Sequence, residues 1–263
     1  MSNSVESLNL TENKDTETSQ SSNPKTVGRG FMNLPDLKSI ISRRLKVEYY
    51  HGKPYYIIRR NPLLLVINRI IKRGFDLLFS SIVIMCVLSW LTPLVGLLIK
   101  LDSKGPIFYK QKRSGRNNRI FHCYKFRTMT YEKHAEFKAA TKNDSRVTKL
   151  GRFLRKSSLD EFAQFFNVFL GDMSIVGPRP HPLKLNDDYK NKVERYMLRH
   201  AVKPGVTGLA QAKGYRGEVF DSLTMKQRVK VDIFYIENWT FWLDVKIIFL
   251  TVYNMCRGDK NAY

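Results

Sequence analysis

The sequence predicts an α-dominant α+β fold that combines a re-entrant membrane helix hairpin, a compact domain and surface-lying amphipathic helices. Three observations lead to this prediction. Residues 77–99 carry no charged side chain, and lysine or arginine flanks them on both sides. Apolar residues recur at helical spacing in several other segments. One short segment around Lys125 instead alternates charged and apolar side chains, as a strand does.

The chain of 263 residues divides into four segments by composition. Residues 1–30 are polar and rich in Ser, Asn, Thr and Lys, which predicts a disordered tail. Residues 31–71 mix basic residues with apolar residues at helical spacing, which is typical of an amphipathic surface segment and also of a packed helix. Residues 72–101 form the apolar helix, and residues 102–263 form the compact domain.

The apolar segment is long enough to cross a bilayer, at about 1.5 Å per residue. A simple span usually has its lysine and arginine excess at one end, whereas both flanks are basic here. Pro93 cannot donate to the carbonyl of Ser89, which bends or breaks a helix. We therefore predict a hairpin that enters and leaves by the same face, with its break at Ser89, Thr92 and Pro93. A spanning helix with a proline kink is the alternative.

The charge balance points to anionic partners. The chain has 45 Lys+Arg against 23 Asp+Glu and a formal net charge of +22. This excess favours anionic membrane lipids, phosphorylated substrates or nucleic acid. Because no recognisable nucleic-acid module accompanies the charge, we expect no nucleic acid partner. The three cysteines lack CxxC spacing, which predicts neither a disulfide framework nor a zinc site and favours a reducing compartment.

The last part of the chain predicts an amphipathic helix with an aromatic face. Trp239 and Trp242 lie three residues apart, and tryptophan favours the headgroup layer of a membrane. A helix whose aromatic face packs on the compact domain is the alternative.

An acidic pair lies within a basic stretch. Ser158 followed by Glu161 fits a capping box, which predicts that a helix begins there. Asp160 and Glu161 could simply complement the dipole of that helix. The functional interpretation is that nearby cations such as Arg152 hold a carboxylate ionised, so that it can attack phosphorus or bind a divalent cation.

Three other segments carry cations in patterns typical of anion sites. Lys112 and Arg113 precede a glycine, where backbone amides can approach a phosphate. Lys125 and Arg127 would share one face of a strand. Arg179 lies between two prolines that limit its backbone freedom, and a rigid arginine suits a pyrophosphate or a nucleotide. A solvated basic edge is the alternative for each.

Five motifs follow one another in the order Lys72-Arg73-x-Phe75-Asp76, Lys125-Phe126-Arg127-Thr128-Met129, Ser158-Leu159-Asp160-Glu161, Asn167-Val168-x-x-Gly171-Asp172-Met173-Ser174 with Val176-Gly177-Pro178-Arg179-Pro180, and Lys203-Pro204-Gly205-Val206-Thr207-Gly208. Over roughly residues 68–257 the chain resembles the bacterial sugar transferases. These are the monotopic polyprenol-phosphate phosphoglycosyl transferases, and we expect the short form without the multi-helix N-terminal domain.

This resemblance implies an enzyme that transfers a sugar-1-phosphate from a UDP-sugar to polyprenyl (undecaprenyl) phosphate and releases UMP. It implies the first, membrane-committing step of a glycan or exopolysaccharide pathway, on the cytosolic face of the bacterial inner membrane. It also implies Mg²⁺ and an Asp160–Glu161 dyad that serves catalysis and metal binding, and it is compatible with a homodimer. Membrane-tethered nucleic-acid binding and a structural adaptor are the alternatives.

The resemblance extends to other site residues, with departures from the family pattern. It places Gln211 and Arg216 in the substrate loop, where Leu209 replaces the usual tryptophan. The usual Ser-Pro pair of the helix break is absent, because Pro93 follows Thr92. We therefore expect the apex of the hairpin to be shifted by about one turn.

Overall fold

The computed structural model describes residues 45–50, 53–58, 61–131, 144–215 and 222–257. The predicted tail, residues 1–30, lies outside the described residues. Within them the protein is mostly helical with three two-stranded sheets, as the α-dominant prediction requires. The described residues divide into two compact units, with the boundary after Ile57.

In the first unit, β1 (Leu45–Tyr50) pairs with β2 (Lys53–Ile58), whose last residue falls in the second unit. Strands therefore occupy part of the segment for which helical spacing was predicted. Aromatic and β-branched residues make up half of β1 and most of β2, and this composition favours a pleated backbone over a helix.

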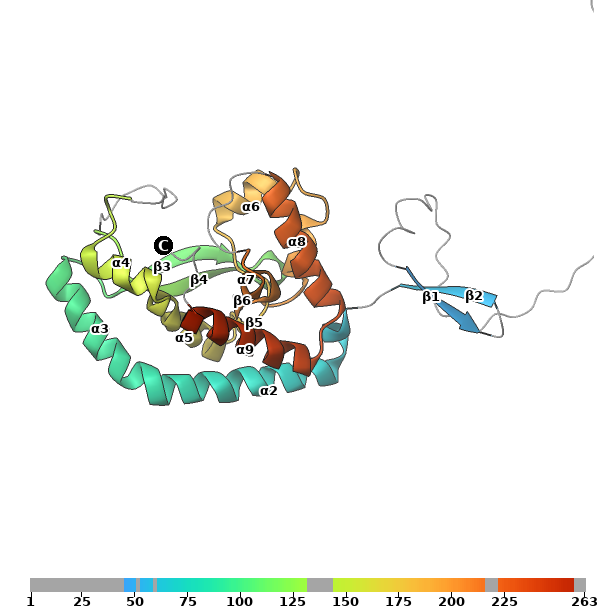
Figure 1. Ribbon diagram of the computed structural model, residues 1–263, viewed down its shortest axis with the longest axis horizontal. Coiled ribbons are helices and arrows are strands. Elements are labelled where there is room, and N and C mark those ends of the chain that lie inside the picture. Colours follow the sequence, from blue (N-terminus) through green and yellow to red (C-terminus); the bar gives the residue numbers. More distant parts are fainter. Residues whose placement is uncertain (1–44, 51–52, 59–60, 132–143, 216–221, 258–263) are drawn as a thin grey trace, which may run out of the picture. The chain divides into compact units, whose positions relative to one another are not determined.

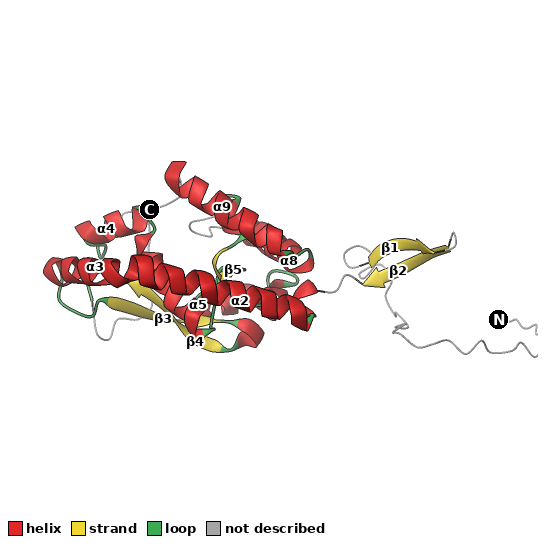
Figure 2. Ribbon diagram, turned by 90° about the horizontal axis from the view of Figure 1, so that it is seen from below, coloured by secondary structure: helices red, strands yellow, loops and turns green. Residues whose placement is uncertain are grey.

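The second unit begins with a long apolar helix. After the turn η1 (Pro62–Leu64), it comprises α2 (Val66–Val83), the π-helical stretch η2 (Ile84–Leu88) and α3 (Ser89–Asp102). These 37 residues are long and apolar enough to cross a membrane, and no other helix in the described part of the chain is. The helix turns between α2 and α3 in Figure 1, whereas Figure 2, seen from below, shows the two nearly in line.

Of the predicted break residues Ser89, Thr92 and Pro93, only Ser89 lies at the irregular stretch of the helix. α3 continues through Pro93, and the irregularity lies one to two turns earlier, in η2. There the backbone N–H of Ser89 donates to the carbonyl of Ile84, five residues back, and the Ser89 Oγ donates to the Met85 carbonyl at 2.7 Å. A π-bulge and a side-chain donor together satisfy the local carbonyls, so the chain bends without unwinding.

The rest of the second unit surrounds two further small sheets. β3 (Phe108–Ser114) and β4 (Ile120–Phe126) are antiparallel, with Gln111 opposite Cys123, and β5 (Ser174–Val176) and β6 (Gly205–Thr207) are parallel. The helices and helical turns around them are η3 (Arg116–Asn118), α4 (Lys149–Lys156), η4 (Leu159–Ala163), α5 (Gln164–Leu170), α6 (Leu183–Tyr189), η5 (Tyr196–Ala201), α7 (Leu209–Ala212), α8 (Ser222–Glu237) and α9 (Phe241–Arg257). α5 lies beside α2 in both views.

A buried ionic cluster anchors α2 to the second unit. The Lys72 Nζ donates to Asp244 Oδ2 of α9 at 2.7 Å and to the carbonyl of Val176 in β5 at 3.0 Å. The Tyr235 hydroxyl donates to Asp244 Oδ1 at 2.7 Å, and the Trp239 Nε1 donates to Asp244 Oδ2 at 3.0 Å. The first motif of the chain therefore fixes the apolar helix to the strand that precedes Arg179.

The two tryptophans of the predicted aromatic face have different environments. Trp239 is 4% exposed and precedes α9, whereas Trp242 is 76% exposed on α9. The prediction of one shared face is wrong, because helical spacing begins only at Phe241 and the indole of Trp239 is held by Asp244. Trp242 remains available to a surface partner.

Candidate active site

The acidic pair lies in a tight turn that joins two helices. The Thr148 Oγ1 accepts a hydrogen bond from the backbone N–H of Gly151 at 2.9 Å and so caps α4. At the end of α4 the chain reverses through Ser158, whose φ of 56° is left-handed. Asp160 and Glu161 follow in the first turn of η4.

The predicted capping box is therefore wrong, although a helical turn does begin after Ser158. The Ser158 side chain makes no capping hydrogen bond. The Glu161 carboxylate does not reach back to the turn, because two cations from other elements bind it. The Glu161 side chain therefore points into a polar cluster and does not cap the helical turn.

Both oxygens of Glu161 are occupied. The Lys125 Nζ of β4 donates to Oε1 at 2.7 Å. The Arg179 guanidinium binds the same carboxylate through two nitrogens, with Nη1 at 3.0 Å from Oε2. Such a bidentate pair fixes the orientation of the arginine as well as its position.

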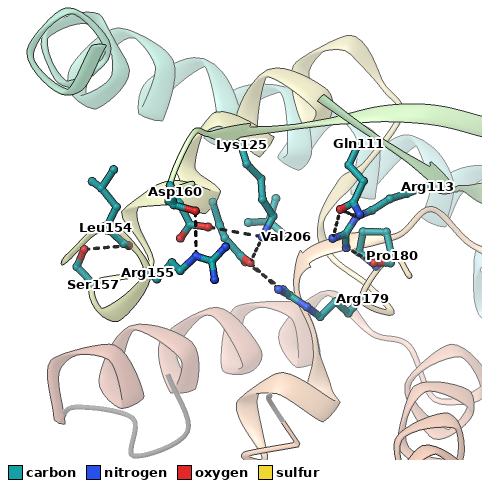
Figure 3. Close-up of polar contacts among 12 residues, drawn as sticks. Gln111, Arg113, Lys125, Leu154, Arg155, Ser157, Asp160, Arg179, Pro180 and Val206 are labelled. Carbon is teal, nitrogen blue, oxygen red and sulfur yellow. Dashed lines mark hydrogen bonds and ion pairs between the residues drawn. The ribbon is translucent and has the colours of Figure 1, made fainter. Parts of the chain in front are cut away.

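Asp160 is buried beside this pair but is not bonded by it. The exposed fraction of Asp160 is 7%, and its Oδ2 lies 3.6 Å from the Lys125 Nζ. No described residue donates a hydrogen bond to the Asp160 carboxylate. The Nε of Arg155, which lies on the same side of the cluster in Figure 3, donates instead to the Thr128 Oγ1 at 2.9 Å. Asp160 therefore keeps its oxygens available for a ligand.

Electrostatics separate the two acids. Burial raises the pKa of Asp160, and the charge of Lys125 opposes this shift only in part. Burial alone would also raise the pKa of Glu161, but Arg179 and Lys125 more than offset it and hold that pKa well below its usual range. Nearby cations were expected to hold a carboxylate ionised. The pKa of Glu161 is shifted in that direction, whereas the pKa of Asp160 is shifted in the opposite direction.

Two further arginines hold the backbone around Arg179. The Arg113 guanidinium of β3 donates to the carbonyl of Pro180, and the Arg199 Nη2 donates to the carbonyl of Arg179 at 2.8 Å. Arg199 is itself paired at 2.8 Å with Asp232, which is also buried. Arg113 was predicted to bind phosphate, but its guanidinium is directed to this loop and to the Gln111 side chain. Sequence reasoning missed Arg199 because no recognisable motif surrounds it.

Three other predicted cations, Lys112, Arg127 and Arg152, do not join the cluster. Lys112 is exposed on β3, where strand alternation places it on the opposite face from Arg113, and Arg152 is exposed on α4. Arg127 donates to the carbonyls of Ile99, Ser103 and Lys104, which caps the end of α3. The structure thus separates Arg127 from Lys125, because β4 ends at Phe126 and the chain turns away.

The predicted substrate loop is only partly described. Gln211 lies in α7, 3% exposed, and its Nε2 donates to the carbonyl of Val206 at 3.2 Å. Its Oε1 is buried without a hydrogen-bond partner among the described residues. Arg216 lies outside the described residues.

The donor set of the site is compatible with magnesium. No group of three or more His, Cys, Asp or Glu side chains gathers within the described residues. Mg²⁺ does not need such a group, because it commonly takes one or two carboxylates and completes its shell with waters and substrate phosphates. The Asp160 carboxylate meets this requirement, whereas the oxygens of Glu161 are already bound by Lys125 and Arg179.

The site and the helix together indicate a class of protein. A buried carboxylate pair held by lysine and arginine suits phosphate chemistry, and the apolar helix fits membrane association. The chain belongs to the bacterial sugar transferase family, whose sequence model matches residues 67–258. This match confirms the resemblance that the motifs predict.

Named relatives resemble most of this chain. The UDP-glucose:undecaprenyl-phosphate glucose-1-phosphate transferase of Klebsiella pneumoniae is 43% identical over 233 residues, which cover 88% of this chain and 49% of that protein. The UDP-N-acetylgalactosamine-undecaprenyl-phosphate N-acetylgalactosaminephosphotransferase of Aeromonas hydrophila is 37% identical over 86% of this chain and 52% of its own length. The chain therefore spans about half the length of these two relatives. An exopolysaccharide production protein of Rhizobium leguminosarum bv. phaseoli is 41% identical over 72% of this chain and 97% of its own length.

Proposed function

We propose that this protein transfers a sugar-1-phosphate from a UDP-sugar to polyprenyl phosphate and releases UMP, as the first membrane-committing step of a bacterial glycan pathway. The observation that carries the proposal is the Asp160 carboxylate. It is buried, no described residue donates a hydrogen bond to it, and its neighbour Glu161 fixes two cations beside it. The names of the Klebsiella and Aeromonas relatives, which both act on undecaprenyl phosphate, support this substrate class.

The proposed reaction has two displacements at phosphorus. An oxygen of Asp160 forms a bond to the sugar-bearing phosphorus, while the phosphoanhydride P–O bond breaks and its electron pair leaves with UMP. The phosphate of the lipid carrier then attacks the same phosphorus, and the bond to Asp160 breaks, which regenerates the carboxylate. Lys125 and Arg179 lie beside Asp160 and neutralise the negative charge of the phosphates during both steps.

Glu161 supports this reaction by holding cations in place. Two roles were left open by the sequence, a magnesium ligand and a proton acceptor. The pKa of Glu161, which Arg179 and Lys125 hold well below its usual range, argues against the second role. We propose that Glu161 keeps Arg179 and Lys125 oriented toward the phosphates, and that a carboxylate oxygen of Asp160 contributes to binding Mg²⁺. When bound, the ion would neutralise the diphosphate of the donor.

We further propose that the helix dips into the cytosolic face of the inner membrane without crossing it. Leu63 before α2 and Leu88, Leu91 and Ile99 further along all pack into the hydrophobic core of the second unit. A spanning helix would need its two ends on opposite sides of the bilayer, whereas both ends here contact one compact unit. The opposite side exposes large apolar side chains, namely Leu78, Ile82, Met85, Leu94, Leu97, Leu98 and Leu101.

Single cysteines test this topology. In a background without the native cysteines, cysteines at Asn61 and Asn118 should both resist an impermeant thiol label in intact cells. Labelling at Asn61 alone would establish a spanning helix and overturn the proposed topology.

Turnover tests the activity itself. The purified protein should release more than one equivalent of UMP per enzyme from a UDP-sugar only when polyprenyl phosphate and Mg²⁺ are both present. A panel of UDP-sugars identifies the sugar, since a polar contact to one hydroxyl can discriminate strongly. Tight binding of oligonucleotides at physiological salt, without UMP release from any UDP-sugar, would favour the nucleic-acid-binding alternative instead.

A further inference from the structure

A basic cavity lies at the start of the apolar helix, apart from the acidic pair. Its volume is about 180 Å³, and neither Asp160 nor Glu161 lines it. Three of its cationic side chains come from separate elements: Arg69 from α2, Arg116 from η3, and Lys203 from the segment before β6. Lys203 is the first residue of the last of the five sequence motifs.

The other charged groups of this cavity have partners within the protein. Lys72 is paired with Asp244, and the Arg73 guanidinium donates to the carbonyls of Val168 and Phe169. The Asp76 Oδ1 accepts hydrogen bonds from the Ser174 hydroxyl and the backbone N–H of Ile175.

By contrast, the side chains of Arg69, Arg116 and Lys203 form no hydrogen bond or ion pair with any described residue. The Nε of Arg116 is buried and has no hydrogen-bond partner in the part of the chain that the structure describes. A buried donor that lacks an acceptor costs stability, so the cavity is suited to an anion that would supply one.

The electrostatic environment of Lys203 also indicates an excess of positive charge in the cavity. Burial lowers the pKa of Lys203, and the neighbouring charges of Arg73 and Arg116 lower it further. Asp76 and Asp172 act in the opposite direction but do not offset these effects. The positive charge of the cavity therefore exceeds what its own carboxylates neutralise.

Exposed apolar side chains adjoin residues of the cavity in the chain and indicate the kind of anion. Ile70 follows Arg69 on α2 and is 61% exposed. Leu170, at the end of α5 and next to the Phe169 carbonyl that binds Arg73, is 65% exposed. A free phosphate ion gains nothing from such surfaces. A phospholipid can place its phosphate among the cations and its acyl chains along the exposed apolar side of α2.

We propose that this cavity binds the phosphate of an anionic membrane phospholipid and thereby fixes the depth of α2 in the membrane surface. The proposal rests on the membrane association proposed above and is independent of the transfer reaction, since no group of the acidic pair contributes to the cavity.

Native mass spectrometry of the full-length protein in a neutral detergent tests the proposal. Phosphatidylglycerol is the probe, and phosphatidylcholine is the neutral comparison. We expect the wild type to retain one phosphatidylglycerol at low lipid concentration. The double variant Arg116→Gln/Lys203→Gln should need at least about ten times more of it, as expected for lost charge-assisted contacts. The control Lys100→Gln/Lys104→Gln, which removes two exposed cations near the other end of the helix, should bind like the wild type.

Each competing result has a definite meaning. Equal retention by the wild type and the Arg116→Gln/Lys203→Gln variant overturns the proposal, and so does an equal loss in the control, which would indicate general charge attraction. Full competition by inorganic phosphate at the concentration of the lipid would make a free ion the ligand. Preferential binding of polyprenyl phosphate would make the cavity a carrier site. Both outcomes also contradict the proposal.

A stability measurement guards against misfolding of the double variant. Because the two cations repel their neighbours, their removal should not lower Tm in neutral detergent. Phosphatidylglycerol should raise the Tm of the wild type but not that of the variant. If the double variant does not fold, Arg69→Gln, a change at an exposed side chain, should still weaken retention of the lipid.

Discussion

Two buried carboxylate clusters lie in the second unit, and they differ in how their oxygens are satisfied. Asp244, 1% exposed, accepts hydrogen bonds from Lys72, Tyr235 and Trp239. Asp160, 7% exposed, has a lysine 3.6 Å away and no hydrogen-bond donor among the described residues. Both carboxylates are buried. The anchoring cluster around Asp244 differs from the reactive cluster around Asp160 because hydrogen-bond donors occupy the oxygens of Asp244, whereas no described residue donates to those of Asp160.

The largest expected effect on activity follows from Asp160→Asn. The amide keeps the size of the side chain but cannot act as the nucleophile, so UMP release should fall by on the order of 10⁴ or more. Because burial already disfavours the charged form of Asp160, the free energy of unfolding should be nearly unchanged. Retention of substantial turnover would reduce Asp160 to a structural acid.

The matched change in the anchoring cluster is Asp244→Asn, and it should act on stability. Lys72 would lose its ion-pair partner in a buried site and keep only the charge of Asp76, with which it forms no ion pair, so the loss should approach about 3–5 kcal/mol. Denaturant unfolding measures this loss, and turnover per folded molecule should stay close to that of the wild type. A variant that unfolds normally but fails to release UMP would contradict the division between the two clusters.

Glu161→Gln tests the role of the saturated acid within the reactive cluster. The neutral amide cannot hold Arg179 and Lys125 by charge, so turnover should fall by about 10²-fold or more. Glu161→Asp keeps the charge with a shorter reach and should recover part of that loss. If Glu161→Gln turns over at the wild-type rate, the reaction does not require the Glu161 carboxylate to orient Arg179.

The pH dependence of turnover is the smallest of the expected effects. It tests whether Asp160, whose pKa is raised, is the reactive acid rather than Glu161, whose pKa is lowered. Only the ionised form of Asp160 can attack, and burial raises its pKa, so turnover should fall on acidification at a pH above the ordinary aspartate value of about 3.9. Lys125 lowers this pKa, and Lys125→Met should therefore move the acid limb to higher pH as well as reduce the rate. An acid limb that moves to lower pH would show that a different group controls it.

Much of the active site could be predicted from the sequence because it is local. Asp160 and Glu161 are neighbours in the chain, and the prolines around Arg179 restrict its backbone wherever that segment folds. The family resemblance rested on motifs of this kind. Lys125 required one further step, because only the packing of β4 against η4 brings its amine to the Glu161 carboxylate.

Long-range contacts account for what the sequence did not predict. Arg113 and Arg127 have the charge of phosphate ligands, but backbone carbonyls of distant segments bind them. Arg199 acts on Arg179 through its carbonyl, which leaves no trace in side-chain patterns. The bend of the apolar helix lies in η2 rather than at Pro93, since an extra residue in one turn leaves no proline or glycine signal.

The mass of the intact protein tests the account most directly. After incubation with a UDP-sugar and Mg²⁺ but without a lipid acceptor, the wild type should gain the mass of one sugar-phosphate. Peptide mapping should place this mass on Asp160, and the later addition of polyprenyl phosphate should remove it. Asp160→Asn should gain no mass under the same conditions. An adduct on Asp160→Asn, or on any other residue of the wild type, would contradict the covalent role of Asp160.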